Sequence, residues 1–321
     1  MGANIFGRYV WLIEQFRCYG RLTYEEVNNL WRRSGLSYGD DLAIRTFHNH
    51  RKAIFDIFEV DIVCDIKGGY KYYIDRLEDL EKDDLRIWLI SSYTAMNQIQ
   101  ADRMLKERII FEYVPSGDKW LSIIIEAMRS DRVLNIAYQS FRRSEPSHFD
   151  IEPYYLKIVK RRWYVLARNP YYSSLNKQKS RGDGDNYPHD VFSIYALDRI
   201  LGCRILETSF SLKEDFDANE YFHGCCGVLR STEEPIRIVL KAYYDAPDYL
   251  RTLPIHESQQ ELVDMNDDNA TYFELTVCPT FDFYQLLLSQ ADQIEVLKPK
   301  SVRMQMNAFA KKLLSYYNEG D

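Results

Sequence analysis

Three stretches in the first 58 residues repeat apolar side chains at the spacing of amphipathic helices. The first stretch ends at Gly20, and its apolar residues are Tyr9, Leu12, Ile13 and Phe16. Thr23 opens the run T-Y-E-E, a capping-box pattern that predicts the start of a second helix with Val27, Leu30 and Trp31 on one face. Ser37, three residues before Asp40, is expected to cap a third helix, whose apolar side would carry Ile44, Phe47, Ile54, Phe55 and Phe58.

The opposite side of the third helix is polar, and two short strand-like runs follow it. The runs VDIVCDI (60–66) and YKYYI (70–74) are joined by Lys67-Gly68-Gly69, which predicts a tight hairpin. Three helices followed by a hairpin are typical of a winged helix-turn-helix, whose third helix enters the major groove of DNA. The residues that we expect to contact DNA lie on this helix and hairpin: Arg45, Thr46, His48, Asn49, Arg51, Lys52, Lys67 and Lys71.

The chemistry of these side chains suits DNA, but the segment as a whole is not basic. Arg can bridge two acceptors of guanine and Asn can bridge adenine, whereas Arg51, Lys67 and Lys71 suit phosphates. Residues 1–75 carry as many acidic as basic side chains, so a DNA-binding surface has to be local. Asp40 and Asp41 would face phosphates badly unless they only cap the helix. The alternative is a helical protein-interaction domain with a solvated polar face.

The pattern changes twice in the middle of the chain. The run 77–111 contains neither Gly nor Pro and predicts a helical connector, a kind of segment that often pairs in dimers. An amphipathic helix over 120–134 is followed by alternating patterns over 134–141, 149–169 and 191–206. Several short strands behind one helix predict a small β-barrel. Residues 169–190 are expected to form a long polar loop.

The tail predicts a separate α+β domain. Residues 233–318 have the order strand, helix, two strands, helix, strand and helix, which is typical of a ferredoxin-like layout. Such an extension commonly contacts a second subunit. The run FHGCCG (222–227) is interpreted as linker with buried cysteines rather than as a thiol site. The fold class is therefore α+β multidomain, with expected boundaries at 1–75, 76–116, 117–208, 209–232 and 233–321.

Composition and charge narrow the function classes. The chain has a net charge of −7, yet no Asp or Glu occurs from Lys157 to Arg181, where basic and aromatic residues alternate. A solvated strand edge and loop would explain this run, and a site for an anion would explain it equally. The six cysteines are scattered without a C-x-x-C pair, which favours reduced thiols in a cytoplasmic protein and argues against a metal site. We expect no cofactor, signal peptide or membrane span.

The order of several short motifs resembles that of the WYL-domain transcriptional regulators of bacteria. These motifs are I-A-Y (136–138), P-Y-x-L (153–156), R-W-Y-V-L (162–166) and L-D-R-I (197–200). Val165 departs conservatively from the leucine that gives the family its name. Residues 45–54 and 68–74 look like the family's winged helix, and 235–306 looks like its C-terminal extension, so the resemblance covers nearly the whole chain.

The resemblance implies an Sm/SH3-like barrel that senses a nucleic-acid or nucleotide effector and controls the DNA-binding domain. The positions that match the family's recurrent polar and aromatic residues are Tyr138, Tyr154, Trp163, Tyr164, Arg168 and Arg199. Charge alone extends the set to Lys157, Arg161 and Arg162. Because neighbouring residues of a strand face opposite sides of a sheet, Trp163 is expected to pack inward and Tyr164 to face the ligand.

The resulting hypothesis is an effector-responsive transcription regulator, acting as a homodimer on a near-palindromic operator. A second hypothesis is an adaptor that senses single-stranded nucleic acid without binding an operator. The third, an enzyme acting on nucleic acid, is disfavoured because the sequence has no Gly-rich phosphate loop, no H-x-E with C-x-x-C pattern and no cluster of acidic metal ligands. The operator, the effector and the direction of regulation stay open.

Overall fold

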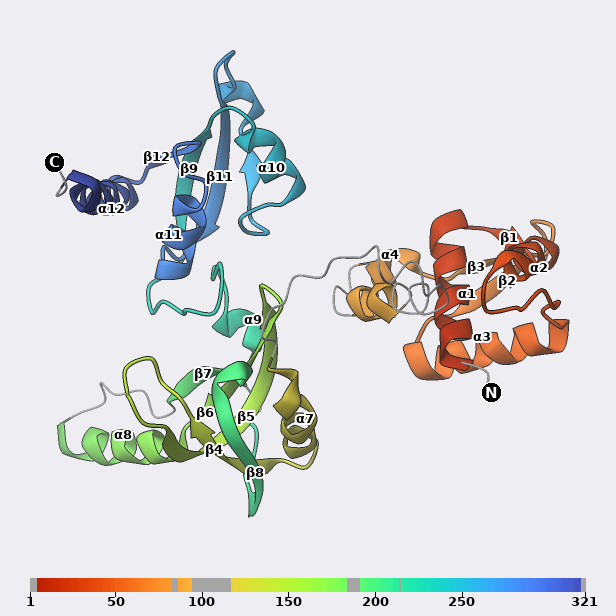
Figure 1. Ribbon diagram of the computed structural model, residues 1–321, viewed down its shortest axis with the longest axis horizontal. Coiled ribbons are helices and arrows are strands. Elements are labelled where there is room, and N and C mark those ends of the chain that lie inside the picture. The colour runs from red at the N-terminus through yellow and green to blue at the C-terminus, as the bar shows by residue number, and fades with distance from the viewer. Residues whose placement is uncertain (1–4, 82–85, 94–116, 184–190, 214, 319–321) are drawn as a thin grey trace. The chain divides into compact units, whose positions relative to one another are not determined.

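The computed structural model describes residues 5–81, 86–93, 117–183, 191–213 and 215–318 (Figure 1). The chain divides into two compact units, residues 1–112 and 113–321, each of which is described by itself. Within the described ranges, every helix is too short or too polar to span a lipid bilayer.

The first unit contains the helices and the hairpin that the sequence predicts. Its helices are α1 (Ile5–Tyr19), α2 (Tyr24–Arg33) and α3 (Ile44–Phe58). Strands β2 (Ile62–Asp65) and β3 (Lys71–Ile74) form the hairpin, and the unexpected short strand β1 (Leu22–Thr23) pairs with the other side of β3. The sheet is antiparallel, in the order β1-β3-β2.

The caps of α2 and α3 differ in how well the sequence predicted them. Thr23 forms the expected capping box with Glu26 at the start of α2. The expected cap of α3 by Ser37 is wrong, because α3 begins at Ile44 after Ala43, which makes no side-chain cap. The hydroxyl of Ser37 instead donates hydrogen bonds to the carbonyl oxygens of Arg32 and Ser34, at the end of α2.

The core of the first unit is built from all three helices and extends past the hairpin. Phe16, Phe47 and Ile54 are fully buried in it. Ile44 and Phe55 were expected on the apolar side of α3, but both are more than half exposed, because they lie at the edges of the buried stripe. The core also includes residues from α4 (Leu77–Glu81) and from the helical residues 86–93, beyond the expected boundary at 75. The rest of the predicted connector, residues 82–85 and 94–116, lies outside the described residues.

The second unit begins with a five-stranded antiparallel sheet beside the helix α7 (Leu121–Arg129). In spatial order its strands are β7 (Phe192–Ala196), β6 (Arg162–Arg168), β5 (Ser147–Val159), β4 (Arg132–Tyr138) and β8 (Ile200–Ser209). The long strand β5 pairs with β4 up to Ile151 and with β6 from Glu152, and its register shifts between Pro153 and Tyr155. Such a shift bends a strand and increases its twist.

Two expectations for this region need correction. The sheet is not a closed barrel, because the edge strands β7 and β8 do not pair with each other. The chain passes from β7 to β8 through the single turn η2 (Leu197–Arg199) without forming a hairpin. Part of the predicted polar loop is helical, as α8 (Pro170–Asp183). Asn169 precedes this helix, and its side-chain oxygen accepts a hydrogen bond from the backbone N–H of Tyr172 at 3.1 Å.

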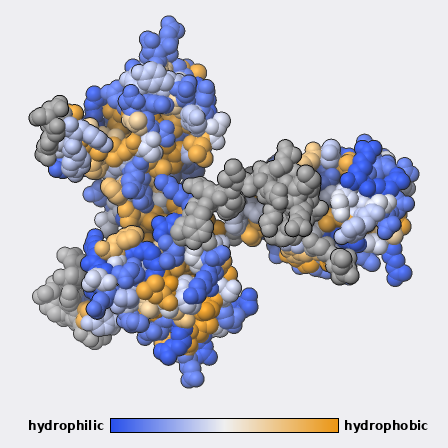
Figure 2. All heavy atoms as spheres, viewed as in Figure 1, coloured by the Kyte–Doolittle hydropathy of each residue, from blue (hydrophilic) through white to orange (hydrophobic). Residues whose placement is uncertain are grey.

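The last part of the chain follows the element order that the sequence predicts. It runs β9 (Ile236–Ala242), α10 (Ala246–Thr252), β10 (Gln260–Glu261), β11 (Thr271–Val277), α11 (Phe281–Leu288), β12 (Ile294–Lys298) and α12 (Lys300–Asn318). The four strands form one antiparallel sheet in the order β10-β11-β9-β12, with its own hydrophobic core. Apolar side chains are also scattered over the polar surface (Figure 2), and those of α12 that are well exposed include Met304, Leu313 and Leu314.

The segment between the two sheets is tied to the last domain by short hydrogen bonds. It contains α9 (Ala218–Tyr221) and the cysteine pair of the run 222–227. Asp282 accepts hydrogen bonds from the backbone N–H groups of Val228 and Leu229 at 2.7 and 2.8 Å. Cys225 is buried and Cys226 is half-buried, as expected for linker cysteines, and the described residues contain no cluster able to hold a metal ion.

Candidate functional site

The open face of α3 carries the polar side chains that the sequence assigned to base contacts. Arg45, His48, Asn49 and Lys52 are all exposed, and Thr46 is half-buried. The four exposed residues lie on the same side of α3 because positions three, four and seven apart share one face of a helix. This face can present both guanidinium and amide groups to an external partner.

Arg51 has a different place from the other predicted DNA-binding residues. Its Nε donates a hydrogen bond to the carbonyl oxygen of Ile62 at 2.7 Å, and its guanidinium lies 4.8 Å from the ring centre of Tyr72. Arg51 therefore fastens the hairpin to α3, and most of its donors are engaged inside the domain. Lys67 and Lys71, on the hairpin, are exposed.

Three of the predicted effector residues are part of the fold rather than of an open surface. Tyr154 is only 4% exposed, and its ring stacks on Phe210 with 5.8 Å between ring centres. Trp163 packs against the core of the sheet, as expected. Arg168 forms an ion pair with the buried carboxylate of Glu152.

Arg162 and Tyr164 lie together on the side of β6 opposite to Trp163. The guanidinium of Arg162 is 5.6 Å from the ring centre of Tyr164 and donates a hydrogen bond of 2.6 Å to Asp198. That hydrogen bond raises the pKa of Arg162, and burial raises the pKa of Tyr164. An anion binding here has to share Arg162 with Asp198. Arg161 lies next to this pair, exposed in the turn between β5 and β6.

Arg199 braces the loop that follows β4. Its Nε and a terminal nitrogen both donate to the carbonyl oxygen of Gln139, at 2.9 and 2.7 Å. The same guanidinium lies 3.5 Å from the ring centre of Phe141 and 5.0 Å from that of Tyr138. Arg199 thus holds the loop against the sheet, and these two bonds use two of its five N–H donors.

Lys157 is the predicted cation best placed for an external anion. No ion pair joins it to a carboxylate in the part of the chain that the structure describes. Its Nζ lies 3.8 Å from the ring centre of Phe222, and burial lowers the pKa of its ammonium group. It opens into a cavity of about 530 Å³ that His223, Cys225 and His256 also line. Burial outweighs the nearby charge of Asp282 in its effect on this ammonium group, so an anion close to Lys157 would stabilise its charged form, although Glu220 and Glu257 also line the cavity.

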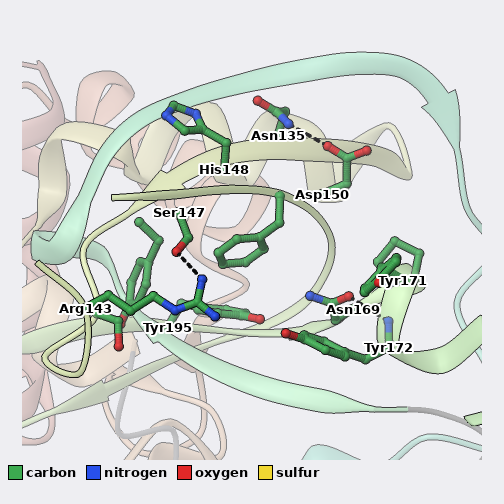
Figure 3. Close-up of a pocket in the computed structure, with 13 residues that line it drawn as sticks. Asn135, Arg143, Ser147, His148, Asp150, Asn169, Tyr171, Tyr172 and Tyr195 are labelled. Atoms are coloured by element: carbon green, nitrogen blue, oxygen red, sulfur yellow. Dashed lines mark hydrogen bonds between the residues drawn. The ribbon is translucent and has the colours of Figure 1, made fainter. Parts of the chain in front are cut away.

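A second and larger cavity was not predicted from the sequence. It has a volume of about 840 Å³ and lies between the ends of β4 and β5, the loop after β4, the start of α8 and β7 (Figure 3). Four of its lining residues are tyrosines, namely Tyr138, Tyr171, Tyr172 and Tyr195, and we call it the tyrosine pocket. Tyr138 is the single member of the predicted effector set that lines it. The pair Tyr171–Tyr172, directly after Asn169-Pro170, is the feature of the sequence that could have indicated this wall.

Comparisons with known proteins identify two domains in the second unit. A family model described as the WYL domain matches residues 119–205, and one described as the WCX domain matches residues 234–314. No curated protein matches the chain.

Two solved structures are distantly similar. One is proteasome accessory factor B/C (PafBC) of Arthrobacter aurescens, at 18% identity and a TM-score of 0.28, with 64% of this chain and 28% of that chain covered. The other is described as a CRISPR Cas-related protein, at 11% identity and a TM-score of 0.36, with 99% of this chain and 85% of that chain covered. On the two domain matches, the chain is a WYL-domain protein in which a WCX domain follows the WYL domain.

Proposed function

We propose that this WYL-domain protein is a DNA-binding transcription regulator whose WYL domain binds a nucleic-acid or nucleotide effector. The observation that carries the proposal is the exposed polar face of α3 beside the hairpin β2–β3, in a chain that also contains a WYL domain. In the proposed role the first unit is a winged helix-turn-helix. Its third helix would place Arg45 and Asn49 against base edges, and Lys52, Lys67 and Lys71 would contact phosphates.

The acidic residues before α3 are compatible with this role. Asp41 accepts a hydrogen bond of 2.9 Å from the side-chain amide of Asn28 and lies 3.4 Å from Arg32. Its negative charge is therefore partly compensated inside the domain. Asp40 is exposed and would weaken phosphate binding modestly, as a single screened surface charge does.

The effector site of the proposal centres on Lys157, Arg162 and Tyr164 of the WYL domain. Lys157 and Tyr164 are paired across β5 and β6, so their side chains lie on the same face of the sheet. A half-buried lysine and a ring on one face suit a phosphate and a stacked base. The effector can regulate DNA binding only if it binds the DNA-competent and DNA-incompetent conformations with different affinities.

The DNA-binding part is tested by selecting duplexes from a random library with the full chain and then measuring affinity for the enriched site. The variant Arg45→Ala/Asn49→Ala should bind that site at least about tenfold more weakly, because it loses two base contacts. Arg129→Ala, which removes an exposed arginine from α7, is the matched control and should bind normally. Equal affinity of the double variant and the control would refute the role of α3.

The effector part is tested with the nucleic acids and nucleotides that copurify with the protein. Lys157→Ala should weaken their binding and reduce its dependence on salt, whereas Lys311→Ala on α12 should change neither. If the wild-type protein enriches single strands but no duplex, the second hypothesis, a sensing adaptor without an operator, is favoured. We further propose that the protein acts as a homodimer without catalysing a reaction. Light scattering on the purified chain tests its dimerisation.

A further inference from the structure

We propose that the tyrosine pocket binds a purine nucleoside whose amino group is adjacent to a ring N–H, of which guanosine is the simplest probe. This site is separate from the cationic effector site proposed above, and the inference does not rest on that proposal. Its volume of about 840 Å³ lies in the usual range of small-molecule pockets.

The pocket offers two aromatic surfaces to a planar ligand. One is a cluster in which the ring of Tyr195 lies 5.2 Å from that of Tyr138 and 5.5 Å from that of Phe149. The other is the pair Tyr171 and Tyr172, whose rings are 5.4 Å apart and whose side chains are at least half exposed. The accessible rings of Tyr171 and Tyr172 are suited to stacking on a nucleobase, since every base has a flat π-face, whereas Tyr195 is only 9% exposed.

The two surfaces are held by one buried residue, Asn169, which is only 2% exposed. Its side-chain oxygen accepts the hydrogen bond from the backbone N–H of Tyr172, and its own backbone N–H donates one of 2.9 Å to the carbonyl oxygen of Val191, just before β7. Figure 3 shows Tyr195 and the Tyr171–Tyr172 pair next to this side chain. The pocket is therefore formed before a ligand enters, which reduces the entropy lost on binding.

The polar groups of the pocket select for an amino group. Asn135 and Asp150 are paired across β4 and β5, on the face of the sheet opposite to Tyr138 and Phe149, so they line a different part of the pocket from that cluster. Asn135 donates a hydrogen bond of 2.6 Å to Oδ1 of Asp150, which orients the carboxylate. No intramolecular partner occupies Oδ2 of Asp150 within the described residues, so this oxygen is available to accept from N–H groups of a ligand. A carboxylate can accept from the adjacent N1–H and amino group of guanine, whereas inosine lacks the amino group.

The same lining argues against a polyanionic ligand. Arg143 is the one arginine or lysine among the described lining residues, and it already donates a hydrogen bond of 3.0 Å to the hydroxyl of Ser147. The negative charge of Asp150 opposes it at the other end of the pocket (Figure 3). A nucleic-acid strand needs several cations along its backbone, and this pocket does not supply them.

The test measures guanosine, inosine and guanosine monophosphate binding to the full chain by calorimetry at two salt concentrations. We expect saturable binding of guanosine, about tenfold weaker binding of inosine, and no gain in affinity from the phosphate. Tyr172→Ala should weaken guanosine binding about 5- to 150-fold, because it removes one stacking surface and keeps the backbone bond to Asn169. Asp150→Asn, of the same shape, should abolish the preference for guanosine over inosine.

Tyr244→Ala is the matched control, since this tyrosine is 77% exposed on the WCX domain and should leave binding unchanged. The proposal fails if guanosine does not bind, or if Tyr172→Ala binds it as the wild type does. It also fails if affinity rises with each added phosphate and falls steeply with salt. None of these results bears on duplex selection by α3, so failure here is distinguishable from failure of the proposed regulatory function.

Discussion

Arg168 gives the sharpest test of how the cations of the WYL domain are used. The resemblance assigned it to effector binding, but in the structure it is paired with Glu152, its direct neighbour across β5 and β6. The side chain of Glu152 is only 7% exposed. Arg168→Met removes the counter-charge and leaves a buried carboxylate, which costs about 3–5 kcal/mol in such sites. We therefore expect a large loss of local stability from this single substitution.

The assay is amide hydrogen exchange over β5 and β6, because a chain of several domains has no single unfolding free energy. Exchange there should accelerate about 100-fold or more in Arg168→Met. The double variant Glu152→Gln/Arg168→Met should recover most of the protection, since neither charge is then left unpaired. If the single variant keeps wild-type protection but loses effector binding, Arg168 is a ligand contact and the structural reasoning is refuted.

Three further predictions concern other sites. Burial, with a smaller contribution from Arg8, lowers the pKa of His50. The first unit should therefore lose stability as the pH falls below about 6.5, the pKa of histidine in the unfolded chain. In a pH series of thermal melts, His50→Gln should make this loss smaller. Gly117→Ala should destabilise the contact between Gly117 and the backbone of Asp198, because the added Cβ would lie 2.3 Å from the backbone nitrogen of Asp198 and Gly117 has a φ of +75°. Unchanged hydrogen-exchange protection at Asp198 would contradict this prediction. Burial raises the pKa of Cys203 to about 11, so iodoacetamide at pH 8 should label the exposed Cys18 much faster than Cys203. Equal labelling rates of the two cysteines, measured by mass spectrometry, would refute the expected protection of Cys203.

Features that depend on neighbouring residues were predicted well. The capping box at Thr23 and the hairpin around Gly68-Gly69 were confirmed because a cap and a tight turn are set within a few residues. The opposite orientations of Trp163 and Tyr164 follow from the alternation of a strand. The cap at Ser37 failed because its hydroxyl found acceptors at the end of the preceding helix.

The use of each cation was not predictable from the sequence. Arg168 pairs with a residue 16 positions away, Arg162 with one 36 positions away and Arg199 with one 60 positions away. Composition showed a run of positive charge without acidic residues, but it did not show that acidic groups and carbonyl oxygens from other strands lie next to it. Lys157 stands out only once those neighbours are in place.

By itself, the sequence determined most of the helices and strands and the polar face of α3, because these follow from local periodicity and turn chemistry. Tertiary structure alone decided that the five-stranded sheet stays open, which cations are paired and where the tyrosine pocket lies. Each of these depends on segments that meet only after strand pairing. Packing contacts and hydrogen bonds act only within a few ångströms, and charge interactions weaken with separation, so all of them are set by distance in space rather than by distance along the chain.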